Sequence, residues 1–207
     1  ASVIKASQAL AAEIQLEQLL DRLLHLAIEH AGAERGQLVL EHDGNPAVHV
    51  VGTLDRVEVN AEQGTPLGEA RGLPFALVNL VRRSREPVVL ADGGTGGAFA
   101  DDPHFVRSRV RSIICMPVVH LGRLIGVLYL ENNLAPGVFT PRRTEILQIL
   151  ASQAAIAIVN ARMFAEIARL KDRLQAENVY LIEEIKTQAG FEEIVGKSQV
   201  LRKVLSQ

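Results

Sequence analysis

The chain has 207 residues, of which 48% are hydrophobic and 22% charged, so it can bury a core of ordinary size. Its 22 basic and 24 acidic residues give a net charge of −2, which provides no overall attraction to nucleic acid or to an anionic membrane. The single cysteine excludes an intramolecular disulfide and is typical of a reducing compartment. We therefore expect a cytoplasmic protein. With no apolar run of about 20 residues and no signal-like start, we expect no contact with a membrane.

Residues 7–31 have apolar side chains every three to five positions, which is the period of an amphipathic helix. Leu16, Leu20 and Leu24 lie away from the main apolar stripe and widen it beyond the needs of one sheet contact. Such surplus apolar surface predicts a second partner. We expect this partner to be another copy of the chain.

The next segments predict short strands and helices. Residues 37–41 and 47–54 are Val- and Leu-rich runs joined by turn formers, which indicates a hairpin. Residues 73–81 fit a short helix and 87–90 a strand. The glycine-rich stretch 92–97 predicts a mobile loop that leads into a short helix near residues 99–105.

Residues 112–120 and 124–130 are the strongest hairpin signal, because both alternating sets of side chains are apolar in each run. A strand that is apolar on both faces must be central and covered on both sides. If helices cover one face, residues 64–105 must cover the other.

A long helix is predicted from Thr140 as N-cap and Pro141 at the first helical position, with no glycine or proline before Gly190. A helix of this length would extend past a compact domain. The apolar residues of its second half follow a short, imperfect heptad that Glu177 interrupts, which indicates a marginal parallel coiled coil. These apolar residues are Ile167, Leu170, Leu174 and Leu181.

Segments 111–117, 122–132, 139–141 and 150–161 resemble motifs of the GAF domain, a sensory relative of the PAS fold. The resemblance covers most of residues 5–165. It implies an α+β fold: an antiparallel sheet of about five or six strands, with helices on one face and loops and short helices on the other, followed by the long projecting helix. A sensor domain at residues 1–165 would then precede a helical coiled-coil linker at 166–189.

The end of the chain resembles a different family. Residues 180–185, 191–198 and 201–205 look like the linker and the opening of the AAA+ ATPase domain of sigma-54-dependent transcriptional activators, so 190–207 would be the truncated start of that domain. Gly196-Lys197-Ser198 is not a P-loop, because Glu192 occupies the position of its first glycine. Sigma-54 RNA polymerase and DNA would be contacted only through domains outside this chain, and the full-length protein would be an AAA+ ATPase.

No nucleophile elbow, metal-binding helix motif or catalytic carboxylate pair is recognisable, so we expect no catalysis, metal or cofactor in these residues. Some GAF domains bind cyclic nucleotides and carry a signature that includes a lysine and an acidic pair, although this signature is not itself the set of contacts with the nucleotide. Asn133 and the pair Arg143-Thr144 stand at those positions here, which argues against a cyclic nucleotide.

A small-molecule cavity is the remaining hypothesis. We expect Phe99, His104, Phe105, Cys115 and Tyr129 to form its walls, with Arg109 or Arg111 pairing with a ligand carboxylate. The alternative is a filled core with surface arginines.

Three functions fit this sequence. The first is a dimeric sensor that controls a downstream AAA+ ATPase in a transcriptional activator and dimerises through its first and long helices. The second is a ligand-free GAF dimerisation module. The third is the GAF unit of a sensor kinase, which the residues after Phe191 disfavour.

Overall fold

The structure is a computed structural model that describes residues 2–60, 63–92, 99 and 102–188. The predicted ATPase opening at 190–207 and nearly all of the glycine-rich loop lie outside these residues. The elements are α1 Ser2–Ala31, β1 Arg35–His42, β2 Asn45–Thr53, β3 Val57–Val59, β4 Thr65–Pro66, α2 Phe75–Ser84, β5 Val88–Leu90, α3 Pro103–Ser108, β6 Ser112–His120, β7 Arg123–Asn132 and α4 Pro141–Gln188.

The strands form one antiparallel sheet in the order β3-β2-β1-β7-β6-β5, with β4 also paired to β2. The central position predicted for β6 and β7 is confirmed, because each has a strand on both sides. The described sheet has seven strands rather than the predicted five or six. The difference comes from β3 and β4, which are only three and two residues long and pair with β2.

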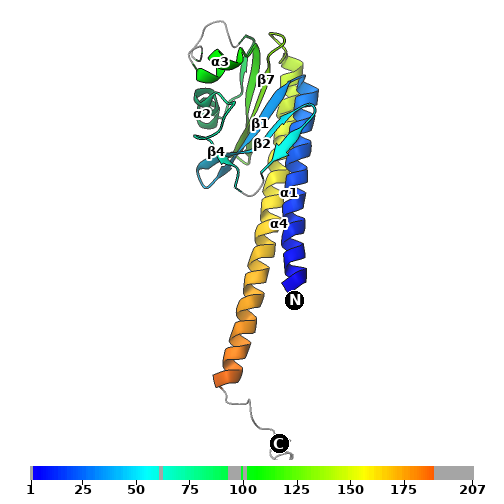
Figure 1. Ribbon diagram of the computed structural model, residues 1–207, viewed down its shortest axis with the longest axis vertical. Coiled ribbons are helices and arrows are strands. Elements are labelled where there is room, and N and C mark those ends of the chain that lie inside the picture. Colours follow the sequence, from blue (N-terminus) through cyan, green and yellow to red (C-terminus); the bar gives the residue numbers. More distant parts are fainter. Residues whose placement is uncertain (1, 61–62, 93–98, 100–101, 189–207) are drawn as a thin grey trace, which may run out of the picture. The chain divides into compact units, whose positions relative to one another are not determined.

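Two separate apolar layers cover the sheet, as the two-sided strands predict. On one face α1 and the first part of α4 lie side by side and pack against β1 and β7 (Figure 1). On the other face α2, α3 and the loops around them pack over a second core that includes Val39, Cys115 and Tyr129 (Figure 1). The fold therefore agrees with the α+β arrangement expected from the sequence.

Close packing of β1 against β7 depends on Gly126. A Cβ atom at this position would lie 2.2 Å from the carbonyl oxygen of Val39 on the neighbouring strand. No side chain fits within that distance, so glycine is required where the two central strands pair.

Leu16, Leu20 and Leu24 do not form the surplus apolar surface predicted on α1. Leu20 and Leu24 are fully buried in the core between α1 and the sheet, and Leu16 is partly buried against the same core. The prediction was wrong because Leu20 and Leu24 belong to one core cluster that the sheet and the first part of α4 also form. A contact between two copies of the chain cannot use Leu20 or Leu24.

Helix α4 begins as predicted, with Pro141 at its first position and the Thr140 hydroxyl accepting a weak bond of 3.4 Å from the Arg143 amide. By length and composition alone, Pro141–Ile185 contains a window apolar enough to cross a membrane. Leu147, Ala155 and Ile158 are fully buried on the sheet, as in a core helix. The chain divides into two compact units, Ala1–Ala165 and Glu166–Gln207. In the second unit the predicted heptad residues Ile167, Leu170, Leu174 and Leu181 are exposed.

Candidate functional site

Helix α3 is a six-residue element that aims one side chain into the sheet. Asp102 caps it by accepting a 2.8 Å bond from the His104 amide, and Pro103 occupies the first turn. The helix buries His104 and Phe105. The imidazole of His104 is therefore placed above the end of β7.

A buried polar network lies beneath this helix. His104 Nε2 is 2.7 Å from Glu131 Oε2, and the Tyr129 hydroxyl donates to the same oxygen at 2.8 Å. Since a carboxylate only accepts, the imidazole N–H at Nε2 is the donor. Ser108 Oγ lies 3.4 Å from the other ring nitrogen of His104. The Glu131 side chain is only 1% exposed, so its carboxyl group is held almost entirely by protein atoms.

The register of the two central strands explains why these groups meet. Arg35 is paired with Glu131, and Gln37 with Tyr129, across β1 and β7. Residues two apart on a strand share a face, so all four side chains belong to the face that α3 covers. Arg35 Nη1 lies 3.6 Å from Glu131 Oε1, which places a cation at the outer side of the network.

Gln37 connects this network to the segment before α2. Its Nε2 donates to the carbonyl oxygens of Arg71 and Gly72, at 3.1 and 2.8 Å. Gly72 has a φ of +74°, which favours glycine, and a Cβ there would approach the Gln37 amide at 3.1 Å. A strand side chain thus fixes the path of a loop more than 30 positions away.

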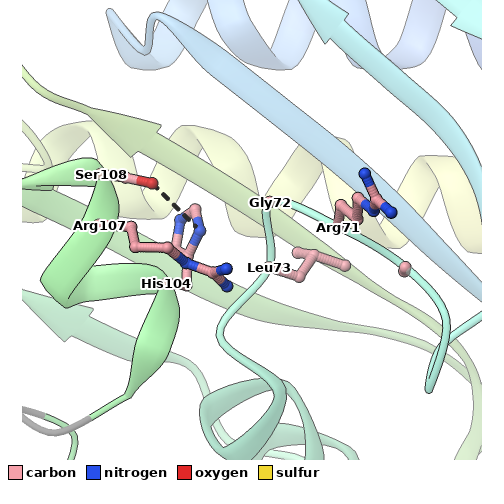
Figure 2. Close-up of a pocket in the computed structure, with 7 residues that line it drawn as sticks. Arg71, Gly72, Leu73, His104, Arg107 and Ser108 are labelled. Atoms are coloured by element: carbon pink, nitrogen blue, oxygen red, sulfur yellow. Dashed lines mark hydrogen bonds between the residues drawn. The ribbon is translucent and has the colours of Figure 1, made fainter.

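A cavity of about 680 Å³ lies between this segment and α3. Figure 2 shows His104, Arg107 and Ser108 from α3 facing the Arg71-Gly72-Leu73 segment across it. Ala70 completes the lining. The volume is in the range of small-molecule sites, about 300–1,000 Å³. Its lining contains two arginines and no acid, so it suits a ligand with a negative group.

Two buried acceptors close to this region have no hydrogen-bond partner among the described residues. They are Glu131 Oε1 and Gln37 Oε1. Buried polar atoms without partners are uncommon in folded proteins. Glu131 Oε1 still has the Arg35 guanidinium at 3.6 Å, and neither Glu131 nor Gln37 lines the cavity.

Burial also suppresses ionisation on this face of the sheet. Desolvation raises the pKa of the Cys115 thiol far above its usual value of 9.0. The pKa of Tyr129 is raised well above 10.0, first by burial and then by the adjacent Glu131 carboxylate. Both groups stay neutral, which fits packing and hydrogen bonding rather than nucleophilic chemistry. Among the described residues, no three His, Cys, Asp or Glu side chains are grouped to hold a metal ion.

The predicted site residues are only partly brought together. His104 lines the cavity, and Tyr129 supports it from below through Glu131. Phe99, Phe105 and Cys115 pack in the core beneath α2 and α3 and do not line it.

The two arginines chosen from the sequence lie elsewhere. Arg109 is the left-handed C-cap of α3, with φ of +50°, and is exposed. Arg111 is also exposed, on the segment that enters β6. Neither lines the cavity, whereas Arg71 and Arg107 do.

Sequence reasoning missed Gln37, Glu131, Arg71, Arg107 and Ser108. A signal was present for the first two, because each is a polar residue inside an otherwise apolar strand. A buried polar side chain in such a place requires a partner. The loop residues carried no comparable signal.

Comparison with known proteins identifies a family for this architecture. Residues 15–158 match the model of the GAF domain. Among solved structures, the GAF domain from an Acinetobacter phosphoenolpyruvate-protein phosphotransferase superimposes with a TM-score of 0.56 at 18% identity, covering 79% of this chain and 98% of that one. This likeness supports the fold.

Two curated relatives are regulatory proteins of different kinds. The hybrid signal transduction histidine kinase G of Dictyostelium discoideum is 32% identical over 114 residues, which is 55% of this chain and 3% of the kinase. The formate hydrogenlyase transcriptional activator FhlA of Escherichia coli is 34% identical over 101 residues, which is 48% of this chain and 14% of the activator. The chain thus spans a small part of each relative's length.

Proposed function

The chain belongs to the GAF family of regulatory sensor domains, and we propose that it controls a sigma-54-dependent transcriptional activator by binding a small carboxylate between the 70–73 segment and α3. The observation that carries this proposal is the cavity itself. Arg71 and Arg107 stand on opposite walls, over a buried network that ends in the imidazole of His104. A guanidinium binds a carboxylate through two parallel hydrogen bonds, so Arg107 is the group we assign to the ligand.

The ligand would change the equilibrium of the domain through the walls of the cavity. One wall is α3, which is joined to β7 through His104 and Glu131, and the other is fixed to β1 through Gln37. A ligand that bridges the two walls binds more tightly when they are close together. It can shift the domain between arrangements only by that difference in affinity.

The proposed output is an AAA+ ATPase domain that follows this chain in the full-length protein. Two things support it: the resemblance of residues 191–205 to the opening of that domain, and the 34% identity to a transcriptional activator. We propose that the chain itself catalyses no reaction, needs no metal or cofactor, and acts in the cytoplasm. Sigma-54 RNA polymerase and DNA would be bound by other domains.

A histidine kinase is the alternative output, because a kinase relative shows nearly the same identity. The coding sequence downstream of Gln207 separates the two. A GxxxxGK[ST] loop within about 30 residues supports the ATPase. A histidine-containing helical pair in its place contradicts it.

We also propose that two copies pair in parallel through α4, with α1 beside it. Ile149, Ile156 and Met163 are exposed and spaced seven residues apart, and Leu170 continues the spacing in the sequence. A seven-residue apolar repeat is the pattern of a coiled-coil seam. Pairing by this seam alone, with no ligand, is the second candidate function: a dimerisation module.

A thermal-shift experiment distinguishes the sensor from the ligand-free module. The probes are acetate, pyruvate, succinate and glutamate, each titrated to millimolar concentration at constant ionic strength. A probe at 100 times its dissociation constant stabilises the fold by about 2.7 kcal/mol, a shift of several degrees.

The matched variants are Arg107→Gln, inside the cavity, and Arg111→Gln, outside it. Both arginines are exposed, so neither change should unfold the domain. The sensor proposal expects the shift to disappear in Arg107→Gln and to persist in Arg111→Gln. If the thermal shift disappears in Arg111→Gln alone, the ligand binds at Arg111 instead. If no probe shifts the melting temperature, the ligand-free dimerisation module is favoured.

A further inference from the structure

A second, arginine-rich hollow lies at the opposite end of the central strands. Its volume is about 340 Å³. It lies where the C-terminal end of α2 meets two turns, one between β1 and β2 and the other between β6 and β7. Glu41 is six residues along β1 from Arg35, a distance of about 20 Å, so the hollow is separate from the cavity at α3. It is lined by Glu41, Asp43, Gly44, Arg82, Arg83, Arg85, Arg123 and Leu124.

Two of its arginines are fixed by the fold. Arg82 donates from Nε and Nη2 to the two carboxylate oxygens of Glu41, and from Nη1 to Asn79 at 2.6 Å. Arg85 donates to the carbonyl oxygen of Gly122 in the β6–β7 turn at 2.6 Å. These bonds hold both guanidinium groups in place before any ligand arrives.

The other two arginines are not used by the fold. Within the part of the chain that the structure describes, the side chains of Arg83 and Arg123 make no hydrogen bond or ion pair, and both are exposed. They come from different elements, the last turn of α2 and the first residue of β7. Attraction to the negative end of a helix accounts for Arg83 but not for Arg123.

The charges around the hollow do not balance. Four arginines and two acids line it, which leaves two positive charges in excess. Arg162 of α4 adds a further cation nearby, where its Nη1 donates to the Glu41 carbonyl at 2.9 Å. Burial is the main cause that lowers the pKa of Arg162; the positive charge of Arg123 lowers it further, and Asp43 acts in the opposite direction. A bound anion would reduce the repulsion between Arg123 and Arg162.

We propose that this hollow binds a small molecule carrying two phosphate groups. Guanidinium groups bind phosphate oxygens in pairs, and every basic group in the hollow is an arginine. Two unpaired guanidinium groups from different elements can each bind one phosphate, so they match a ligand with two linked phosphates better than a ligand with a single phosphate. The volume is at the small end of ligand sites, which suits a pyrophosphate-sized group rather than a large cofactor.

Calorimetric titration of the chain with inorganic pyrophosphate at low ionic strength tests the proposal. We expect saturable binding that weakens as sodium chloride is added, because the contacts are between exposed charges. Arg83→Gln and Arg123→Gln should each raise the dissociation constant at least about tenfold. Neither residue is buried, so the melting temperatures of both variants should stay near that of the parent.

The matched controls are Arg56→Gln and Arg107→Gln. Arg56 is an exposed arginine in a surface ion pair with Glu58, and Arg107 belongs to the other cavity. Both variants should keep pyrophosphate affinity within about twofold of the parent. Equal loss in Arg107→Gln would place the anion at α3 and overturn the proposal.

Three other outcomes also overturn it. If pyrophosphate shows no detectable binding at millimolar concentration, the proposed site does not exist. Equal affinity for sulfate shows a general attraction of anions without recognition of two phosphates. Tighter binding of a hexaglutamate peptide, weakened by Arg83→Gln and Arg123→Gln, assigns the surface to an acidic polypeptide instead.

Discussion

Replacing Glu131 by alanine tests whether the network below α3 holds the site together. The change leaves His104 Nε2 and the Tyr129 hydroxyl buried without their acceptor. Each of these two buried donors costs about 1–3 kcal/mol when it loses its partner. Removing a carboxylate that is only 1% exposed relieves its desolvation, which acts in the opposite direction. We expect a net loss of about 3 kcal/mol in the free energy of unfolding.

Urea denaturation followed by circular dichroism measures this loss. Glu131→Gln keeps one acceptor oxygen and should lose less than Glu131→Ala, so it reports on the network if the alanine variant is too unstable to study. Glu58→Ala is the control, because this strand glutamate is exposed and should change stability by no more than about 0.5 kcal/mol. A loss below about 1 kcal/mol for Glu131→Ala would refute the reasoning, since two orphaned buried donors cannot cost so little.

Three further predictions concern reactivity, assembly and packing. Because burial raises the pKa of Cys115, the thiol of the folded chain should resist iodoacetamide at pH 8. Above pH 9.0 the thiol ionises in the unfolded chain but not in the folded one, so the free energy of unfolding should fall by up to about 1.4 kcal/mol per pH unit. Cys115→Ala should make this fall with pH less steep. Sedimentation should show that the parent chain is a dimer and that Ile149→Glu dissociates it. Val106→Glu changes an equally exposed residue on α3 and should leave the dimer intact. A monomeric parent chain would contradict the α4 seam. Gly126→Ala should destabilise the fold by more than about 2 kcal/mol, while Gly68→Ala, with open space around it, should not.

The fold was predictable because its signals are local and repeated. Residues 112–120 and 124–130 are apolar on both faces, and this pattern alone placed β6 and β7 inside the sheet with a layer on each side. The short strands β3 and β4 lacked such a pattern, since two or three residues cannot show a period. They exist because β2 offers an edge for them to pair with.

The error at α1 has a different origin. A helical period says which residues share a stripe but not how broad the surface is that receives them. Leu20 and Leu24 were assigned to a partner because one stripe already seemed enough for the sheet, yet both are fully buried on it. The exposed apolar residues are on α4 instead. The expected interface therefore moves from α1 to Ile149, Ile156 and Met163.

The cavity residues depended on where one short helix ends. The sequence predicted a mobile loop that leads into a short helix in this region, and it offered Arg109 or Arg111 as the partner of a ligand carboxylate. Helix α3 instead continues to Ser108, which places Arg107 and Ser108 three and four positions after His104 on the same helical face. Arg109 then ends the helix in a left-handed conformation, so the chain turns away from the cavity at that residue. The end of α3 at Ser108 therefore explains why Arg107 lines the cavity and Arg109 does not.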